Sequence, residues 1–262
     1  MIGIVTNLGK PRTLEAQNRL TDILERRGIL YRTYTEASEI SGCGDDLECV
    51  ITVGGDGSLL RAATHAVERD IPVFGINLGR VGFLTEVKED RMEDAVDRYL
   101  RHEYTEERRM MLHCRLNGET VNHALNDVLV SKSSFSGLTE MNVSVDRDRV
   151  GTVFCDGMLT ATPTGSTGYT LSAGGPVLYA DLDAIVVTPV CSHSVYIRPF
   201  VVKPESVISF EMRDSGFVCI DGTQAADLHA GDIVSVTKSD RTFRLIRFDH
   251  TNIAGLIREK LC

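Results

Sequence analysis

Residues 51–63 constrain the fold more than any other stretch of this chain, because they read as a strand, a glycine-rich turn and a helix in direct succession. The apolar run is β-branched, Gly54-Gly55-Asp56-Gly57 forms the turn, and Ser58 is the expected N-cap of the helix. Such a unit offers backbone N–H groups and a helix N-terminus to a phosphate. A carboxylate there repels phosphate unless it binds a metal or accepts a proton from a reacting hydroxyl. Asp56 therefore indicates phosphate chemistry, with a plain turn capped by an aspartate as the alternative.

The first hundred residues alternate between strand and helix patterns. Strands are expected at 2–5, 29–34, 50–53 and 72–76, and helices at 14–27, from Ser58 onward and at about 91–101. This alternation predicts a parallel, doubly wound sheet of the Rossmann-like kind. Ligands of such sheets bind beyond the carboxyl ends of the strands, where the turn at 54–57 falls.

From about Met110 the pattern changes to short strands separated by turn residues. These strands are expected at 113–116, 124–131, 141–145, 150–154, 184–188, 207–211, 217–220 and 233–237. The fold class is therefore α/β, with a doubly wound domain over 1–106 followed by an all-β, sandwich-like domain over 107–249. The segment 250–262 is expected to pack back on the first domain, with a short helix over 251–261.

Composition argues against several classes of protein. The net charge of −9 disfavours a nucleic-acid partner, which requires a basic face. The seven cysteines are odd in number and form no C-x-x-C pair, which disfavours zinc or disulfides and favours a reducing interior. No signal peptide and no apolar stretch of membrane-spanning length is recognisable. We expect a soluble, cytoplasmic protein without a membrane partner.

Two further features fall near the same sheet edge. Arg61 follows one turn into the helix, where it would reach a phosphate, although a solvated helix arginine fits the position equally well. A second glycine-rich turn, 75–83, follows a buried strand and ends in Phe83. Phe83 in such a turn could stack on a nucleotide base, whereas packing in the core is the commoner role of a phenylalanine.

The second half holds polar residues in unusual places. Asn126-Asp127 interrupts an apolar strand pattern, so one of the two side chains should point inward and needs a partner. A ligand or a structural network would supply it. Asp156-Gly157 precedes a loop at 162–176 that offers many hydroxyls and the ring of Tyr169, which suits recognition of a heterocycle.

Several common motifs are missing from the sequence. It has no G-x-S-x-G elbow, no Walker A motif, no G-x-G-x-x-G opening the first helix and no H-E-x-x-H. Serine hydrolases, P-loop NTPases, conventional dinucleotide-dependent dehydrogenases and zincin proteases are accordingly disfavoured.

Taken together, the motifs resemble those of the NAD kinases over nearly the whole chain. The resemblance rests on Gly54-Gly55-Asp56-Gly57, Gly75-Ile76-Asn77-x-Gly79, Gly82-Phe83-Leu84, Asn126-Asp127, Asp156-Gly157, Thr162-Pro163-Thr164-Gly165-Ser166-Thr167-Gly168-Tyr169 and Ser172-Ala173-Gly174-Gly175-Pro176. Lipid kinases and phosphofructokinases share a turn like the first motif, whereas the loop at 162–169, with Asn-Asp between, is specific to the NAD kinases.

The resemblance implies transfer of a phosphoryl group to the 2′-hydroxyl of the adenosine ribose of NAD+, which gives NADP+. Asp56 would be the catalytic base that accepts the proton of this hydroxyl, with Gly57 and Arg61 nearby in the nucleotide site. The domain over 107–249 would bind NAD. The other cofactor-binding residues would be Phe83, Asn126, Asp127, Asp156, Gln224 and, around the base, Thr167, Gly168, Tyr169, Thr170, Leu171 and Ser172.

The resemblance also implies cofactors and partners. Family members take ATP or inorganic polyphosphate as phosphoryl donor, need Mg²⁺ or another divalent ion, and assemble as homodimers or homotetramers. The sequence assigns no metal ligand. It departs from the family at Phe154, two positions before Asp156, where family members often carry a basic residue that contacts a phosphate.

Two alternatives share part of this pattern. Lipid kinases of the diacylglycerol or sphingosine type have a Gly-Gly-Asp-Gly domain before a β domain. Their second loop usually reads Gly-Thr-x-Asn-Asp, where this chain has Gly79-Arg80-Val81-Gly82-Phe83. A non-catalytic NAD(H)-binding regulator would need the pocket but not the acid, and Asp56 argues against it.

Overall fold

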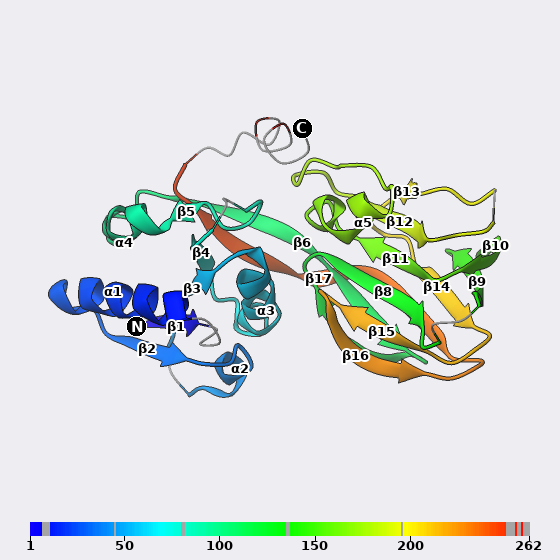
Figure 1. Ribbon diagram of the computed structural model, residues 1–262, viewed down its shortest axis with the longest axis horizontal. Coiled ribbons are helices and arrows are strands. Elements are labelled where there is room, and N and C mark those ends of the chain that lie inside the picture. The colour runs from blue at the N-terminus through cyan, green and yellow to red at the C-terminus, as the bar shows by residue number, and fades with distance from the viewer. Residues whose placement is uncertain are drawn as a thin grey trace. The chain divides into compact units, whose positions relative to one another are not determined.

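The computed structural model describes residues 1–6, 11–44, 46–79, 82–134, 137–194, 196–249, 255 and 258. The chain divides into two compact units, Met1–Arg108 with Phe243–Cys262, and Arg109–Thr242 (Figure 1). The helix predicted over 251–261 lies outside the described residues, except for Gly255 and Arg258, which are helical.

The first unit is built on a parallel sheet. Its strands are β1 (Ile2–Thr6), β2 (Tyr31–Tyr34), β3 (Cys49–Gly54), β4 (Val73–Asn77), β5 (Val87–Lys88) and the end of β17 (Ile233–Arg247). The strand order runs β17-β4-β3-β1-β2, β5 also pairs with β4, and every one of these pairs is parallel. The predicted parallel, doubly wound sheet is confirmed.

Helices cover both faces of this sheet. They are α1 (Pro11–Arg26), α2 (Glu39–Gly42), α3 (Asp56–Ala66) and α4 (Met92–Leu100), with short 3₁₀ turns at Val67–Arg69 and Glu89–Arg91. α1 and α4 share one core cluster with alternate residues of β1, β3 and β4, such as Ile4, Ile51 and Phe74. The buried residues of α3 are outside that cluster, and α3 contacts β3 and β4 from the opposite face.

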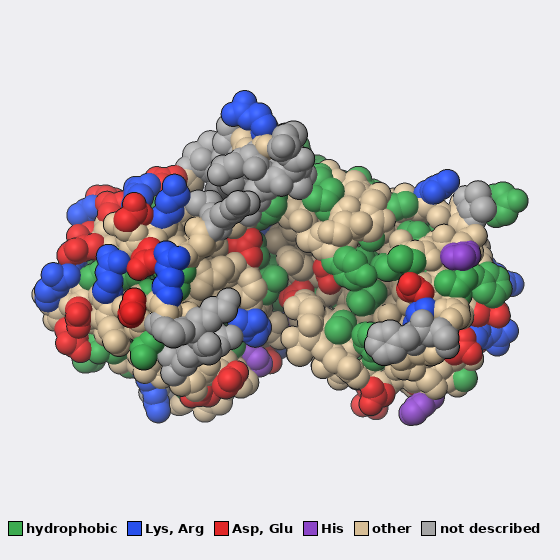
Figure 2. Space-filling model, in the orientation of Figure 1, with side chains coloured by type: hydrophobic (Ala, Val, Ile, Leu, Met, Phe, Trp, Pro, Cys, Tyr) green, Lys and Arg blue, Asp and Glu red, His purple; other side chains and the backbone are tan. Residues whose placement is uncertain are grey.

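Charged side chains of both signs lie interleaved over α1 and α4 on the solvent side (Figure 2). Arg26, the last residue of α1, and Arg27, which follows it, pair with Glu93 of α4, and Arg27 also pairs with Asp97. Most of these side chains are partly or well exposed, so the pairs contribute little to stability. These pairs show that nearby carboxylates largely neutralise the positive charges of this surface.

The strand order creates a switch point in the first unit. β1 lies between β2 on one side and β3 on the other, so the connections that leave β1 and β3 run in opposite directions. The crevice beyond the carboxyl ends of these two strands is the usual ligand site in doubly wound sheets.

The second unit is a sandwich of two antiparallel sheets. Its strands are the remainder of β6 (Thr105–Leu116), β7 (Glu119–Ala124), β8 (Asp127–Lys132), β9 (Thr139–Val145), β10 (Asp148–Cys155), β11 (Gly157–Ala161), β12 (Ile185–Val190), β13 (Phe200–Val202), β14 (Ile208–Met212), β15 (Gly216–Ile220), β16 (Thr223–Leu228) and the first part of β17. One sheet runs β10-β9-β14-β17, and the other runs β13-β12-β11-β8-β15-β16. Their inner faces form one apolar cluster, as predicted for an all-β, sandwich-like domain.

The structure differs from the predicted elements at three places that matter for the site. α3 begins at Asp56 with Gly55 as its N-cap, so the prediction of Ser58 as the N-cap is wrong. The strand expected over 124–131 is two strands, β7 and β8, and Asn126 lies in the bend between them. The loop at 162–172 contains a 3₁₀ turn (Gly165–Thr167) and the one-turn helix α5 (Tyr169–Ser172). Within the described residues, no helix is long and apolar enough to cross a membrane.

Candidate active site

Asp56 occupies the first turn of α3, and its carboxylate is held by the segment 83–85. Oδ1 accepts hydrogen bonds from the backbone N–H of Leu84 at 3.2 Å, from that of Thr85 at 2.9 Å and from the Thr85 hydroxyl at 2.7 Å. From the described residues, Oδ2 accepts one bond, that from the backbone N–H of Phe83 at 2.8 Å. Because each carboxylate oxygen has two lone pairs, Oδ2 retains a position for one further donor. The carboxylate is therefore held in position, and it can still accept a further hydrogen bond.

Gly82 makes this arrangement possible. A Cβ at residue 82 would lie 1.7 Å from Oδ1 of Asp56, so only glycine lets the carboxylate reach the N–H groups that follow. The Gly-Phe-Leu sequence at 82–84 is thus a docking loop for Asp56. Phe83 contributes its backbone to this loop, and its side chain is partly exposed.

Arg247, at the end of β17, holds the same segment from its carbonyl side. The guanidinium donates to the backbone oxygens of Phe83 at 2.8 Å and Leu84 at 3.2 Å, and it lies near the carboxylates of Glu86 and Glu107. Its side chain is 2% exposed. Buried arginines of this kind fix a backbone because the planar fork satisfies several acceptors at once.

A cavity of about 510 Å³ opens at the switch point of the first unit. It is lined by Arg12, Thr13, Val53, Gly54, Gly55, Ser58, Arg61, Asn77, Leu78 and Gly79. Arg61 therefore faces the same space as the first glycine-rich turn, as its predicted role in a nucleotide site requires. Gly57 is exposed in the first turn of α3.

In the second unit, Asn126 and Asp127 are positioned by Asp221. The Asp221 carboxylate accepts hydrogen bonds from three consecutive backbone N–H groups, of Leu125 at 2.8 Å, Asn126 at 2.7 Å and Asp127 at 3.0 Å. Asp221 has a φ of 47°, in the turn that precedes Gly222. Three charge-assisted bonds from backbone N–H groups to one carboxylate define the bend that carries the Asn-Asp pair.

Burial perturbs both acids. Asp127 is 8% exposed, and desolvation, with a smaller contribution from the Asp221 charge, raises its pKa to about 7. Desolvation also raises the pKa of Asp221 to about 6, against the lowering effect of the three backbone N–H groups. Asp127 can therefore donate as well as accept a hydrogen bond near neutral pH. The Oδ1 atom of Asn126 is buried and has no hydrogen-bond partner within the described part of the chain.

The hydroxyl-rich loop packs against this bend through glycines. A Cβ at Gly165 would lie 2.1 Å from the backbone oxygen of Asn126, and a Cβ at Gly168 would lie 3.6 Å from Nδ2 of Asn126 and 3.9 Å from Oδ2 of Asp127. Asn126, Asp127 and Gly168 thus lie together. The Tyr169 side chain is 45% exposed, which leaves its ring open to stacking.

The remaining residues of this loop have mixed environments. The Thr167 hydroxyl donates to the backbone oxygen of Thr164, and the buried Thr170 hydroxyl lacks a partner among the described residues. Leu171 is partly exposed and Ser172 is exposed.

Asp156 and Gln224 bond to side chains outside the bend at Asn126. Oδ1 of Asp156 is 2.6 Å from Nζ of Lys132, and the hydrogen bond from this ammonium lowers the pKa of Asp156. Phe154 is exposed, and the cation beside Asp156 is Lys132 of β8. The Gln224 side chain donates to Asp227 at 2.8 Å on the edge strand β16.

Sequence reasoning missed several residues that shape the site. Thr85, Arg247, Asp221 and Lys132 have no motif of their own, because each acts on a segment far away in the chain. The Asp-Gly turn at 221–222 is a local signal of positive φ, but not of what the carboxylate binds.

No group of three or more His, Cys, Asp or Glu side chains in the described parts of the chain could hold a metal ion. Mg²⁺ is commonly held by one or two carboxylates together with substrate phosphates and water, so this donor set does not exclude it.

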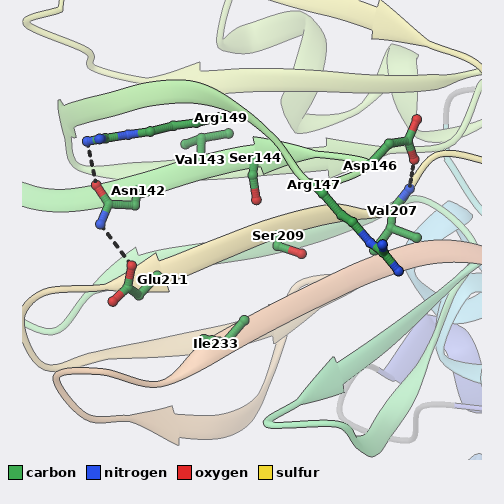
Figure 3. A pocket seen from close by; sticks show the side chains of 10 residues that line it. All are labelled: Asn142, Val143, Ser144, Asp146, Arg147, Arg149, Val207, Ser209, Glu211 and Ile233. Atoms are coloured by element: carbon green, nitrogen blue, oxygen red, sulfur yellow. Dashed lines mark hydrogen bonds between the residues drawn. The ribbon is translucent and has the colours of Figure 1, made fainter.

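A second cavity, of about 660 Å³, lies on the outer face of β9, β14 and β17 (Figure 3). Asn142 donates to Glu211 at 2.8 Å and accepts from Arg149, and Asp146 accepts from the backbone N–H of Val207. None of the predicted site residues lines it, and most of its charged groups are bonded to neighbouring residues.

Two family models match the chain: the ATP-NAD kinase N-terminal domain over residues 31–104 and the ATP-NAD kinase C-terminal domain over residues 125–248. Curated relatives named NAD kinase include one from Magnetococcus marinus, 36% identical over 99% of this chain and 92% of its own length. Another, from Moorella thermoacetica, is 37% identical over 99% of this chain and 88% of its own length.

Solved structures show the same fold. An NAD kinase from Archaeoglobus fulgidus in complex with ATP has a TM-score of 0.83 and 27% identity, with 98% of this chain and 99% of that chain covered. The yeast NADH kinase complexed with NADH has a TM-score of 0.89 at 22% identity, with 100% of this chain and 87% of that chain covered.

Proposed function

The chain belongs to the ATP-NAD kinase family, and from that premise we propose that it transfers the γ-phosphoryl group of ATP to the 2′-hydroxyl of the adenosine ribose of NAD+. The enzyme is thus a phosphotransferase that makes NADP+. Neither a lipid kinase nor a non-catalytic NAD(H)-binding protein is favoured by any of the relatives.

The fixed carboxylate of Asp56 is the observation that carries the proposed chemistry. A ribose hydroxyl is a poor nucleophile at neutral pH, so a base that removes its proton in the transition state accelerates the transfer by about 10²–10⁴. Oδ2 of Asp56 is the proposed acceptor, because it accepts one hydrogen bond from the described part of the chain and retains a lone pair. The bonds from Leu84 and Thr85 to Oδ1 keep the carboxylate from rotating away.

The first unit would supply charge stabilisation to the transferred group. The glycine-rich turn presents backbone N–H groups, and Arg61 faces the same cavity. In phosphoryl transfer little covalent chemistry falls to the protein, and positioning with charge neutralisation provides most of the acceleration.

The second unit supplies the groups proposed to bind NAD. Asn126 offers a buried carbonyl oxygen without a partner among the described residues, and Asp127 offers a carboxyl with a pKa of about 7. Both suit ribose hydroxyls or an adenine edge, since a hydroxyl and an amino group can donate to them. Tyr169 would stack on a ring of the ligand.

A divalent metal ion is proposed to enter as a complex with the phosphates of the donor. Mg²⁺ would neutralise charge on the transferred phosphoryl group. Binding through substrate oxygens fits the described residues, which form no three-ligand cluster. Inorganic polyphosphate as an alternative donor stays a prediction.

A homodimer or homotetramer also stays a prediction. It is supported by the distribution of exposed apolar side chains, because nine of the eleven large ones in the described chain fall within 109–242. Covering such side chains with a second copy of the chain would remove apolar surface from water, which favours association.

One assay tests the proposed function. Purified protein is incubated with NAD+, ATP and Mg²⁺, and NADP+ is measured with an NADP-specific dehydrogenase. Parallel reactions replace ATP by polyphosphate, NAD+ by NADH and Mg²⁺ by EDTA. Phosphorylation of diacylglycerol instead of NAD+ would support a lipid kinase, and NAD+ binding without NADP+ formation would support a regulator.

A further inference from the structure

The cavity beside the glycine-rich turn takes part of its lining from α1, an element outside every motif that carries the family resemblance. Arg12 and Thr13 of α1 line this space together with Gly54, Gly55 and Arg61. The cavity therefore lies between the start of α1, which follows β1, and the start of α3, which follows β3. These are the two strands that flank the switch point.

The electrostatics of this end of α1 favour an anion. Arg12 lies in the first turn of α1, and that turn contains no acidic residue. A helix N-terminus carries a partial positive charge, and the Arg12 guanidinium adds a full positive charge to it. The N-terminus of α3 and the Arg61 guanidinium add to the positive potential of the same cavity.

Thr13 adds a hydroxyl to the lining of the cavity. The residue is 5% exposed, and no hydrogen bond joins its hydroxyl to another described residue. A hydroxyl can donate as well as accept, so it is available to donate to an acceptor inside the cavity, such as a phosphate oxygen.

Arg12 has a partner that it can exchange. Its guanidinium is 3.0 Å from Oε2 of Glu89, and Arg19, two turns further along α1, is 3.1 Å from Oε1 of the same carboxylate. The Arg12 side chain is 65% exposed, and ion pairs this exposed hold a side chain weakly. If Arg12 turns to an anion in the cavity, Arg19 still neutralises Glu89.

We propose that Arg12 and Thr13 bind the phosphate chain of the phosphoryl donor, opposite the glycine-rich turn and Arg61. This inference rests on the proposed function for the identity of the donor. The lining contains no aromatic side chain among its described residues, which suits a phosphate chain better than a base. On donor binding, Arg12 exchanges Glu89 for phosphate oxygens.

The test compares Arg12→Ala with Arg19→Ala, which removes the other partner of Glu89 but lies outside the cavity. KM is measured separately for ATP and for NAD+. Loss of a charge-assisted bond to phosphate should raise the KM for ATP by about 10- to 100-fold in Arg12→Ala. The KM for NAD+ should stay within about twofold, as should both constants of Arg19→Ala.

A binding measurement separates this inference from the proposed function. Inorganic tripolyphosphate is titrated calorimetrically into wild type, Arg12→Ala, Thr13→Val and Arg19→Ala, without NAD+ and without turnover. Weaker tripolyphosphate binding in the first two variants alone supports the assignment even if the enzyme proves to phosphorylate another acceptor. Equal binding in all four proteins overturns it. A raised KM for NAD+ with an unchanged KM for ATP also overturns it, since the cavity would then hold the diphosphate of NAD.

Discussion

The Thr85 hydroxyl donates to Oδ1 of Asp56 at 2.7 Å, and the Thr85 backbone N–H donates to the same oxygen at 2.9 Å. This double contact joins the first residue of α3 to the segment that precedes β5. It separates two roles of one carboxylate: Oδ1 anchors the loop, and Oδ2 is available for proton transfer.

Replacement of Asp56 by Asn tests the base. The amide cannot accept a proton at neutral pH, so kcat should fall by about 10²–10⁴, while the affinity for NAD+ should change little. Steady-state kinetics together with direct NAD+ titration measure the two quantities. Thr85→Val is the matched control, because it removes one anchoring bond and keeps the base, and its loss of kcat should be about tenfold or less. An Asp56→Asn enzyme with wild-type kcat would exclude the base role.

Gly82→Ala tests the docking of the loop on Asp56. The new Cβ would lie 1.7 Å from the carboxylate, so either Asp56 or the loop must move, and kcat should fall by at least about tenfold. Gly42→Ala serves as control, since a Cβ there meets nothing within 4 Å and the enzyme should keep its rate. Comparable rates in the two variants would show that the contact does not matter for turnover.

Arg247→Met should destabilise the protein strongly. The variant leaves Glu86 and Glu107 without their buried cation and frees the backbone oxygens of Phe83 and Leu84. Breaking a buried pair from one side costs about 3–5 kcal/mol. Urea denaturation measures the free energy of unfolding. Arg247→Lys keeps the charge but loses the fork, so it should recover only part of that loss. If the urea midpoint of Arg247→Met equals that of wild type, Arg247 does not stabilise the fold by holding the segment at Phe83 and Leu84.

The buried acids of the second unit predict a pH dependence of stability. The folded-state pKa of Asp127 is about 7 and that of Asp221 about 6, against 3.8 in an unfolded chain. The folded protein therefore binds more protons than the unfolded chain between these values. Their contribution to stability is full below pH 3.8 and is lost as pH rises through about 6 to 7.

Asp127→Asn removes one of these two titrations. The free energy of unfolding, measured by urea denaturation between pH 4 and pH 8 without NAD+, should decline less steeply in the variant than in wild type. Asp221→Asn should instead lose stability at every pH, because an amide can accept fewer of the three backbone bonds. Parallel pH profiles for wild type and Asp127→Asn would contradict the raised pKa.

Much of the fold was predictable from local pattern. The run at 51–63 gave a strand, a turn and a helix because its β-branched residues, glycines and apolar spacing act over a few positions. The switch from strand–helix alternation to strands alone near Met110 likewise predicted the doubly wound sheet and the sandwich, because side-chain periodicity is a local property.

The hydrogen-bond partners that shape the site could not be predicted from the sequence. Ser58 was expected to cap α3, yet the helix starts at Asp56, whose carboxylate is taken by N–H groups 27 to 29 residues away. Asn126 was expected within a strand, yet it lies in a bend shaped by Asp221, 95 residues further along. Neither partner can be inferred from nearby residues, since the competing hydrogen bonds come from other elements.

The sequence by itself determined which residue types stand at the site: the glycines and acid of the first turn, the Asn-Asp pair and the hydroxyl-rich loop. Only the tertiary structure decided which atoms remain available for chemistry. Oδ2 of Asp56 keeps a lone pair because Thr85 and Leu84 occupy Oδ1, and Asp127 has a raised pKa because the fold buries it near Asp221. Hydrogen-bond saturation and desolvation depend on neighbours in space, and these are set only when the chain packs.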